Sequence, residues 1–339
     1  MVRGWASRFR SWFLGDRLVE LSRGFDPERV RIDPIRLNIK NFGYELARSL
    51  APRLAAVDST GEPRDHGLKG KPATQADMES PWFAHWCRKL HIAPIYHRKL
   101  WEYAFVLQVL SERDMLRPGL RGLGFGCGEE PLASCLAAQE IDVTVTDLDP
   151  DQSLGQGWVE TGQHTSALEQ AFKPELVDHE RFSRRVRLEY VDMNRIPSSL
   201  DGLHDFCWSI CAFEHLGSIE NGLRFVENAM RTLKPGGIAV HTTEFNYLSE
   251  NETIEAGSTV LFLRRHFVEL KRRLEVGGHR VADLDFWTGD GVLDRFIDVP
   301  PYSWDGASPD IWGPQPEHIK MTVDRFPCTC FGLIVQRGD

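Results

Sequence analysis

The sequence predicts an α/β fold in which a mostly parallel sheet carries helices on both faces. Short apolar runs alternate with helical stretches through the middle of the chain, and this alternation is typical of parallel sheets. The 339 residues are enough to bury a sizeable core. The content of 42% hydrophobic and 26% charged residues is close to that of globular proteins and excludes a wholly disordered chain.

The chain carries more acidic than basic residues, 49 against 40, which gives a formal net charge of −9. An acidic surface repels the phosphate backbone of DNA and RNA, so we expect no nucleic-acid partner. The seven cysteines are odd in number and none has CxxC spacing, which argues against a disulfide scaffold and a cysteine metal site. Free thiols, together with the lack of an apolar run of about 20 residues, favour a cytoplasmic protein.

Residues 1–57 predict a helical N-terminal extension. Its first segment, residues 1–20, is basic and aromatic and lacks the continuous apolar core of a signal peptide. Such a segment either lies as an amphipathic helix on a membrane surface or a partner, or packs against its own domain. Four aromatic residues share one helical face of this segment: Trp5, Phe9, Trp12 and Phe13.

Three further features divide the chain before the sheet begins. Apolar residues from Leu37 to Leu54 recur close to helical spacing and predict a second helix of the extension. The polar residues 58–79 contain Gly and Pro, which predicts a flexible loop. Ser80-Pro81 provides an N-cap and a first helical residue, so we expect the main domain to cover residues 80–339.

The main domain contains the alternating pattern. Two late β-like runs, 281–286 and 328–335, enclose a polar insertion at about 287–317, and insertions of this size beside a sheet usually carry function. Five earlier apolar runs are expected strands: 120–125, 141–146, 186–191, 206–210 and 238–242.

A glycine loop follows the first of these strands in the segment Gly122-Leu-Gly-Phe-Gly-Cys-Gly128. Glycine lets the backbone pass close to a ligand, and the free amides of the following helix face a carboxylate or phosphate. Asp147 lies 21 positions after Gly126, at the end of the second strand, where a carboxylate can hold a ribose diol. A dinucleotide site needs the spacing GxGxxG, and no register of this loop places a glycine in the sixth position.

Three motifs further along the chain support a nucleoside site. Asp192-Met193 ends the third strand with an acid and an apolar neighbour, which suit the amino group and the ring face of an adenine. Phe213-Glu-His-Leu216 forms a polar turn after the fourth strand. Leu233-Lys-Pro-Gly-Gly237 closes a helix in this prediction and leads into the fifth strand.

In this order and at these distances, the motifs resemble those of the class I S-adenosylmethionine-dependent methyltransferases over residues 120–245. The resemblance implies a Rossmann-like fold with a seven-stranded, mostly parallel sheet and an antiparallel C-terminal strand. It also implies S-adenosyl-L-methionine as the cofactor. The family often has an acid where Gly124 stands and a glycine where Glu130 stands, so Glu130 either partners the cofactor's ammonium group or crowds the loop.

The resemblance implies a role for individual residues in cofactor binding. Asp147 would bind the ribose hydroxyls, with Leu148 beside it in the binding site. Asp192 and Met193 would flank adenine, and Cys211 would offer backbone contacts near the methionine end. Three glycines would line the methionine part of the cofactor: Gly124, Gly126 and Gly128.

A second resemblance concerns the acceptor. Segments such as Tyr96-His-Arg-Lys-Leu-Trp-Glu and His241-Thr-Thr-Glu-Phe-Asn246 are similar to uncharacterised bacterial methyltransferases, some of them encoded near glycan-assembly genes. This likeness implies a small-molecule or glycan substrate, methylated on a hydroxyl of a sugar or glycan intermediate. Two alternatives stay open: N-methylation of an amino sugar or a natural-product amine, and a non-catalytic scaffold or sensor that binds the cofactor.

A hydroxyl acceptor needs a general base, and three candidates follow the fourth and fifth strands. We favour His241, with His215 and Glu244 as the other candidates. Because side chains alternate along a strand, His241 and Glu244 should point to opposite faces of the sheet. In the structural alternative, His241 only bonds a neighbour and His215 packs under the following helix. No ligand spacing compels a metal site.

Two further polar groups allow two interpretations each. The alternating residues His318, Lys320 and Thr322 either face a cleft or form a solvated strand face. On the helix before the sheet, His97 and Arg98 either form part of a lid or belong to the core.

Overall fold

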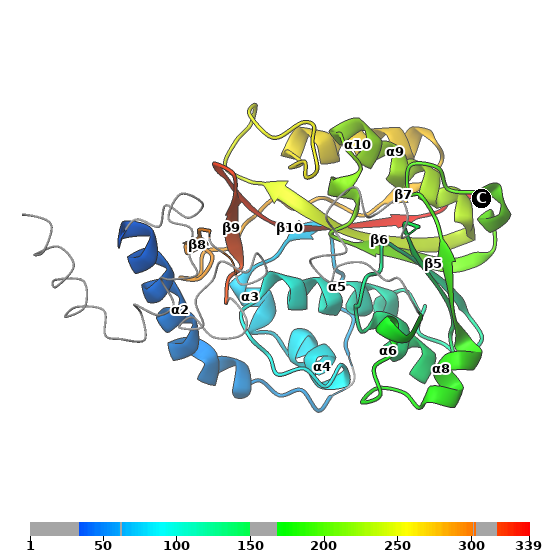
Figure 1. The fold of residues 1–339 in the computed structure, drawn as a ribbon, viewed down its shortest axis with the longest axis horizontal. Coiled ribbons are helices and arrows are strands. Elements are labelled where there is room, and N and C mark those ends of the chain that lie inside the picture. Colours follow the sequence, from blue (N-terminus) through cyan, green and yellow to red (C-terminus); the bar gives the residue numbers. More distant parts are fainter. Residues whose placement is uncertain (1–33, 62, 150–167, 301, 303–316) are drawn as a thin grey trace, which may run out of the picture.

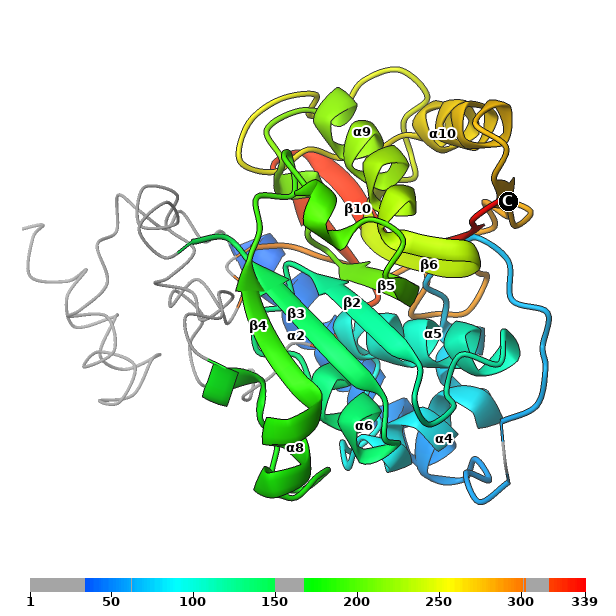
Figure 2. The same ribbon diagram turned by 90° about the vertical axis from the view of Figure 1, so that its right-hand side faces the viewer.

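The computed structural model describes residues 34–61, 63–149, 168–300, 302 and 317–339. A ten-stranded sheet runs through it in the order β4-β3-β2-β5-β6-β10-β9-β8, with β1 and β7 paired to β10. Figure 1 shows the part of the sheet that contains β6, β10 and β9, and Figure 2 shows β4, β3, β2 and β5. From β4 to β6 neighbouring strands are parallel, whereas β10 is antiparallel to β6. The expected mixed α/β sheet with an antiparallel C-terminal strand is therefore confirmed. The strands are β1 (Lys71–Pro72), β2 (Arg121–Phe125), β3 (Asp142–Asp147), β4 (Val186–Tyr190), β5 (His204–Ile210), β6 (Leu233–Asn246), β7 (Arg280–Val281), β8 (Ile297–Asp298), β9 (Lys320–Val323) and β10 (Phe326–Gln336).

The strand count differs from the expected seven because three short strands join the sheet around β10. β1 pairs with the middle of β10, β9 pairs with its beginning, and β8 continues beyond β9. β1 and β8 are two residues long, too short for an alternation of apolar and polar residues to reveal them. β6 also begins earlier than expected, at Leu233, because Leu233 already pairs with His204 of β5 before a register shift.

Helices cover both faces of the sheet (Figure 2). α9 and α10 pack on one face over an apolar cluster that includes Phe225 and Phe267. On the opposite face, α4, α5, α6 and α8 enclose a second cluster around Trp101 and Phe105. The helices are α2 (Pro34–Ala55), α3 (Gln75–Met78), α4 (Pro81–Lys89), α5 (Arg98–Glu112), α6 (Leu132–Ala138), α8 (His179–Arg185), α9 (Ile219–Ala229) and α10 (Arg264–Val276), with 3-10 turns η3 (Leu168–Ala171), η4 (Ser198–Leu200), η5 (Phe213–His215) and η6 (Met230–Thr232).

Side-chain caps fix where several helices begin. Ser80 accepts a hydrogen bond from the amide of Phe83, with proline at the first helical position, as the sequence indicates. Ser218 caps α9 in the same way. His97 caps α5 through Nδ1, which accepts from the amide of Lys99 at 3.3 Å. Residues 97–99 thus form the N-terminal end of α5, and this end points toward the carboxyl edge of the sheet.

Helix α2 of the N-terminal extension is joined to the main domain by a buried polar cluster centred on Asp298. Lys40 Nζ lies 2.7 Å from Asp298 Oδ1, and the Tyr44 hydroxyl donates to Oδ2 at 2.7 Å. Nδ1 of His318 also lies 2.7 Å from Oδ2. His318 and Lys320 are both buried. They therefore face neither a cleft nor solvent, the two alternatives that the sequence pattern left open. The expected amphipathic helix in residues 1–20 lies outside the described residues.

The segment 58–79, which the sequence predicts as a flexible loop, contains regular secondary structure. β1 and α3 occupy its second half, where Lys71 Nζ lies 2.7 Å from Asp77 Oδ1 and Thr74 caps α3. Buried contacts of this kind are invisible to a composition argument, because the residues involved are polar. In the part of the chain that the structure describes, no helix is both long and apolar enough to cross a bilayer.

Candidate active site

A cavity of about 450 Å³ opens at the carboxyl ends of β2, β5 and β6, the edge where open α/β sheets bind ligands. The glycine loop forms one side of it and the N-terminal turn of α5 another. Its lining residues are His97, Arg98, Lys99, Tyr103, Gly126, Cys127, Gly128, Glu129, Glu130, Ile210, Cys211, Glu214, His215, Glu244, Thr259, Met321 and Val323.

The glycine loop has the conformation for which glycine is needed. Gly126 and Gly128 have φ angles of +59° and +51°, a region that side chains disfavour. A Cβ at Gly126 would lie 2.9 Å from the Cβ of Ala212, so a side chain would also collide. The bare backbone of these two glycines therefore forms the wall of the cavity, as expected.

Gly124 has a different role from the expected one, because it lies inside β2 and does not line the cavity. A Cβ at this position would lie 2.3 Å from Cys127 Sγ and 2.5 Å from the indole of Trp208. The Trp208 ring thus fills the space that a side chain at position 124 would need. The side chain of an acid at position 124 would therefore collide with Cys127 and Trp208.

Asp147 ends β3 with a carboxylate that is 5% exposed and tied to the glycine loop. The amide of Gly128 donates to its Oδ2 at 3.2 Å, and the amide of Leu148 donates to its Oδ1 at 2.8 Å. These bonds orient the carboxylate beside the loop, which is the place that a ribose-binding acid requires.

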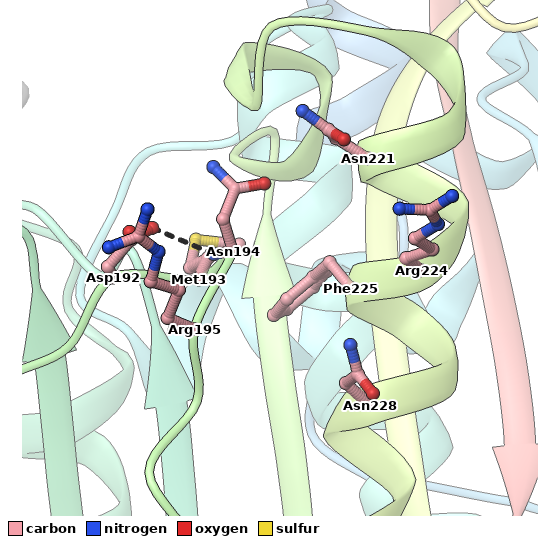
Figure 3. Close-up of a pocket in the computed structure, with 8 residues that line it drawn as sticks. All are labelled: Asp192, Met193, Asn194, Arg195, Asn221, Arg224, Phe225 and Asn228. Carbon is pink, nitrogen blue, oxygen red and sulfur yellow. Dashed lines mark hydrogen bonds between the residues drawn. The ribbon is translucent and has the colours of Figure 1, made fainter.

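Asp192 and Met193 line a second cavity of about 340 Å³ (Figure 3). Asp192, Asn194 and Arg195 stand on one side of it, and Asn221, Phe225 and Asn228 of α9 stand on the other. A Cβ added at Gly126, which lines the first cavity, would lie 3.3 Å from the sulfur of Met193, which lines the second. Met193 therefore lies between the two cavities. The expected adenine residues are therefore adjacent to the glycine loop.

Cys211 lies in a strained turn at the end of β5, with a φ of +45° that is rare for a residue with a side chain. Its amide donates to the carbonyl of Thr242 at 3.0 Å. Its Sγ lies 2.8 Å from Glu102 Oε2 and 3.8 Å from the sulfur of Cys330. Cys211 lines the cavity, and its expected backbone contacts near the methionine end stay a prediction.

A buried charge network forms the floor of the cavity. Burial disfavours the charge of Arg98, but the surrounding acidic groups, with Glu244 first among them, together outweigh burial and hold the Arg98 pKa well above its usual value. Burial likewise opposes the charge on Lys99 and on Glu102, and the attraction between them raises the pKa of Lys99 and lowers that of Glu102. These groups stay ionised at neutral pH. In contrast, burial raises the pKa of Glu130 well above its usual value, so its carboxyl group is protonated.

His241, the favoured base, does not line the cavity. Its ring is fully buried on the other face of β6, 5.5 Å from the ring of Phe225, and its Nδ1 lies 2.8 Å from Ser209 Oγ. Burial lowers the pKa of His241 to about 3. The expected alternation is confirmed, because Glu244 faces the cavity instead. The geometry therefore gives His241 no access to a reacting group.

His215 lies in the cavity wall, in the turn η5. Its Nδ1 is 2.8 Å from the carbonyl oxygen of Ser258 and 3.2 Å from the hydroxyl of Thr259. Of the three candidate bases, the structure thus brings His215 and Glu244 together at the cavity and keeps His241 apart.

Several lining residues were not identified from the sequence. Lys99 and Tyr103 lie on α5, and Met321 and Val323 lie on β9. Charged residues at the start of an otherwise apolar helix were a usable signal for Lys99 and for Glu102 below it. The sequence marked this segment only through the alternating residues His318, Lys320 and Thr322, whereas the pairing of β9 to β10 brings the opposite face, with Met321 and Val323, to the cavity.

The chain was also compared with known proteins. A sequence model described as a methyltransferase domain matches residues 96–278, which is more than half of the chain. No curated protein sequence matches it.

Many solved structures are similar to the chain at low sequence identity. A protein provisionally assigned as a sarcosine dimethylglycine methyltransferase from Galdieria sulphuraria is 16% identical, over 69% of this chain and 84% of that one, with a TM-score of 0.43. A methyltransferase from Aquifex aeolicus is 17% identical, over 68% and 88%, with a TM-score of 0.36. The 1,6-didemethyltoxoflavin-N1-methyltransferase of Burkholderia thailandensis, solved with bound 1,6-didemethyltoxoflavin and S-adenosylhomocysteine, is 11% identical, over 68% and 76%, with a TM-score of 0.38. The chain belongs to the class I S-adenosylmethionine-dependent methyltransferases, and S-adenosyl-L-methionine is its cofactor.

Proposed function

We propose that the protein transfers a methyl group from S-adenosyl-L-methionine to a hydroxyl group of a small polar acceptor, a sugar or glycan intermediate. The contact between His215 Nδ1 and the carbonyl oxygen of Ser258, at 2.8 Å, carries this proposal. Because a carbonyl only accepts, Nδ1 holds the ring proton, and Nε2 of the neutral ring holds the lone pair. A histidine of this tautomer in the cavity wall is suited to accept the proton of a hydroxyl group.

The residues of the cavity fit the cofactor. The bare backbone at Gly126 and the oriented carboxylate of Asp147 provide surfaces for its methionine part and its ribose. Lys99 is positively charged and suits the carboxylate of the methionine part, whereas Glu130 would ionise beside an ammonium group. When bound, the cofactor supplies an electrophilic methyl group on a sulfonium sulfur.

Two histidines would handle the acceptor. Nδ1 of His97 accepts the cap bond from Lys99, so the neutral ring carries its proton on Nε2 and donates to an acceptor oxygen. Burial holds the pKa of His97 well below its usual value, which keeps that ring neutral. Nε2 of His215 would take the proton of the hydroxyl group when that oxygen is methylated. Orientation of the reactants contributes up to about 7–11 kcal/mol and the base about 10²–10⁴-fold in rate.

The first experiment identifies the acceptor by incubating the protein with isotopically labelled cofactor and a cell extract. With that acceptor in hand, we expect His215→Ala to lower kcat by about 10²–10⁴-fold and to leave the Kd for S-adenosylhomocysteine unchanged. His179→Ala, at an exposed position on α8, is the matched control and should keep the wild-type rate. A His215→Ala enzyme with the wild-type kcat would refute the role of His215.

N-methylation is the second candidate, and one observation favours it. The carboxylates of Glu214 and Glu244 both line the cavity and could hold an ammonium group. An amine deprotonated before it binds needs no base at the reacting atom, so His215→Ala would then keep most of the activity. The labelled product separates the two functions directly, since the label would be on nitrogen.

A further inference from the structure

We propose that Cys211, Glu214 and Glu244 bind a divalent metal ion, with Zn²⁺ as the best match, at the acceptor end of the cavity. One possible ligand atom from each residue lies within 4.8 Å of the others, the spacing that a single ion can bridge. All three residues line the cavity, so an ion held there would meet the acceptor. The site itself does not depend on the proposed acceptor, but its role in orienting a hydroxyl group rests on the proposed function.

Two carboxylate oxygens at this position have no hydrogen-bond partner within the described part of the chain. They are Oε1 of Glu214 and Oε2 of Glu244, on side chains that are 0% and 4% exposed. A buried carboxylate oxygen left unpaired is costly, and most such groups in native proteins are satisfied. Their presence in a cavity wall therefore points to a ligand with positive charge.

The second oxygen of each carboxylate is already held in place. Thr243 donates to Oε2 of Glu214 at 2.9 Å, and Arg98 pairs with Oε1 of Glu244. Contacts of this kind behind a ligand orient it and are typical of metal sites. These contacts leave Oε1 of Glu214 and Oε2 of Glu244 for a further partner. The Glu244 oxygen that lies 3.9 Å from Cys211 Sγ is Oε1, so an ion bound to that oxygen would share it with Arg98.

The donor set selects the ion. A thiolate binds borderline or soft metals, whereas Mg²⁺ and Ca²⁺ prefer sites made of oxygen alone. Zn²⁺ accepts sulfur and carboxylate oxygen together, and three protein ligands with an open position are typical of catalytic zinc sites. Binding would release the thiol proton of Cys211 to solvent as the metal–sulfur bond forms, with no change in oxidation state.

The local charge balance agrees with a divalent ion. Once Cys211 has released its proton to bind the ion, its thiolate and the two carboxylates next to the guanidinium of Arg98 carry a net charge of −2, which one divalent ion neutralises. Lys99 and Glu102 form a separate pair, with Lys99 Nζ 3.8 Å from Glu102 Oε1. The rival group of Glu102, Cys211 and Cys330 is less suitable, because Thr242 donates to Glu102 and Lys99 pairs with it. Arg98 does not separate the two groups, since its Nη1 lies 3.0 Å from the Cys330 sulfur and 3.7 Å from that of Cys211.

An ion at this position would assist the proposed reaction. A hydroxyl group bound to a metal ion loses its proton more readily, as water does when zinc binds it. His215 directly follows Glu214 in the chain and lines the same cavity, so the released proton has an acceptor. A second open position would hold a neighbouring hydroxyl group, which suits a vicinal diol such as that of a sugar.

The test measures metal binding on the full chain, independently of activity. After removal of metals with a chelator, we expect one equivalent of Zn²⁺ to bind in competition with a chromophoric chelator. Co²⁺ in its place should give the strong near-ultraviolet absorption of a thiolate–cobalt bond. Cys211→Ser should abolish this absorption, and Glu214→Gln and Glu244→Gln should each weaken Zn²⁺ binding by at least about 10-fold. Cys330→Ser is the matched control and should keep the wild-type affinity.

Far-ultraviolet circular dichroism and binding of S-adenosylhomocysteine check that each variant is folded, and the wild-type Co²⁺ spectrum needs no variant. A wild-type protein that takes up no equivalent of Zn²⁺ at micromolar free metal would overturn the inference. A Cys211→Ser protein with wild-type affinity, or an equal loss in Cys330→Ser, would also do so. Equal O-methylation by the metal-free and the metal-loaded protein defeats the role of the ion in orienting the hydroxyl group, whereas metal binding with methylation on nitrogen defeats only the proposed acceptor.

Discussion

The buried pair of Lys40 and Asp298 offers a quantitative test of how helix α2 is attached. Lys40 is 1% exposed and donates to Asp298 Oδ1 at 2.7 Å and to the carbonyl of Val299 at 2.8 Å. Lys40→Met keeps the length and apolar stem of the side chain but leaves the Asp298 carboxylate without its cation. Removing one partner of a buried ion pair costs about 3–5 kcal/mol.

The structure places the expected cost at the lower end of that range. Asp298 keeps the hydroxyl of Tyr44 and the amide of Val299 as donors, and Nδ1 of His318 stays 2.7 Å away. We therefore expect the free energy of unfolding to fall by about 3 kcal/mol, which is more than a hundredfold in the folding equilibrium. For a chain of this size the midpoint of thermal unfolding should fall by roughly 4 °C.

Urea unfolding at pH 7, followed by far-ultraviolet circular dichroism, measures this change. Lys89→Met on the exposed end of α4 is the matched control, and we expect a change within about 0.5 kcal/mol. The double variant Lys40→Met with Asp298→Asn removes the unpaired charge, so its loss should be smaller than the sum of the two single losses. A Lys40→Met protein within 1 kcal/mol of the wild type, or strictly additive losses, would refute this reasoning.

Three further predictions concern the cofactor site and pH. Asp147→Ala should weaken binding of S-adenosylhomocysteine at least about tenfold in calorimetry, because hydrogen bonds to a charged group contribute about 1.5–3 kcal/mol each, and an unchanged Kd would contradict the ribose assignment. Gly126→Ala should weaken cofactor binding as well, because a side chain there is strained and collides, whereas Gly202→Ala, with a φ of +67° and open space around it, should lose only stability. Burial lowers the pKa of Lys320 to about 8, below its unfolded value, so the unfolded chain binds more protons between pH 8 and pH 10. The free energy of unfolding of the wild type should therefore rise across that window relative to Lys320→Met, by up to about 1.4 kcal/mol per pH unit, and a relative fall would contradict the assignment.

The strands of the central sheet and the glycine loop were predictable because local patterns encode them. Short apolar runs between helical stretches predicted the strands β2 to β6 and β10. Gly126 and Asp147 lie at the positions that the motif spacing predicts. The tertiary partners were not predictable. The space at Gly124 depends on Trp208, a residue 84 positions away that reaches it only through the pairing of β2 with β5.

The candidate catalytic residues were likewise predictable only where local patterns encode them. Alternation along β6 predicted that His241 and Glu244 face opposite sides, but not which side holds the cavity. That depends on α5, whose first turn brings Arg98 to Glu244 from a distant part of the sequence. The burial of His318 and Lys320 was not predictable either, because it depends on partners in another segment of the chain. These partners are Asp298 for His318 and Asp294 for Lys320.

The central position of β10 limits how far this protein can be shortened. The matched methyltransferase domain ends at residue 278, yet β10 fills the place beside β6 and pairs with it from Cys328 to Gln336. A fragment trimmed to the matched span would leave the backbone amides and carbonyls of β6 bare and uncover Phe267, which stacks on Phe331 at 4.2 Å. Such an open edge recruits strands from other molecules. Aggregation, rather than a minimal enzyme, is the expected fate of that fragment.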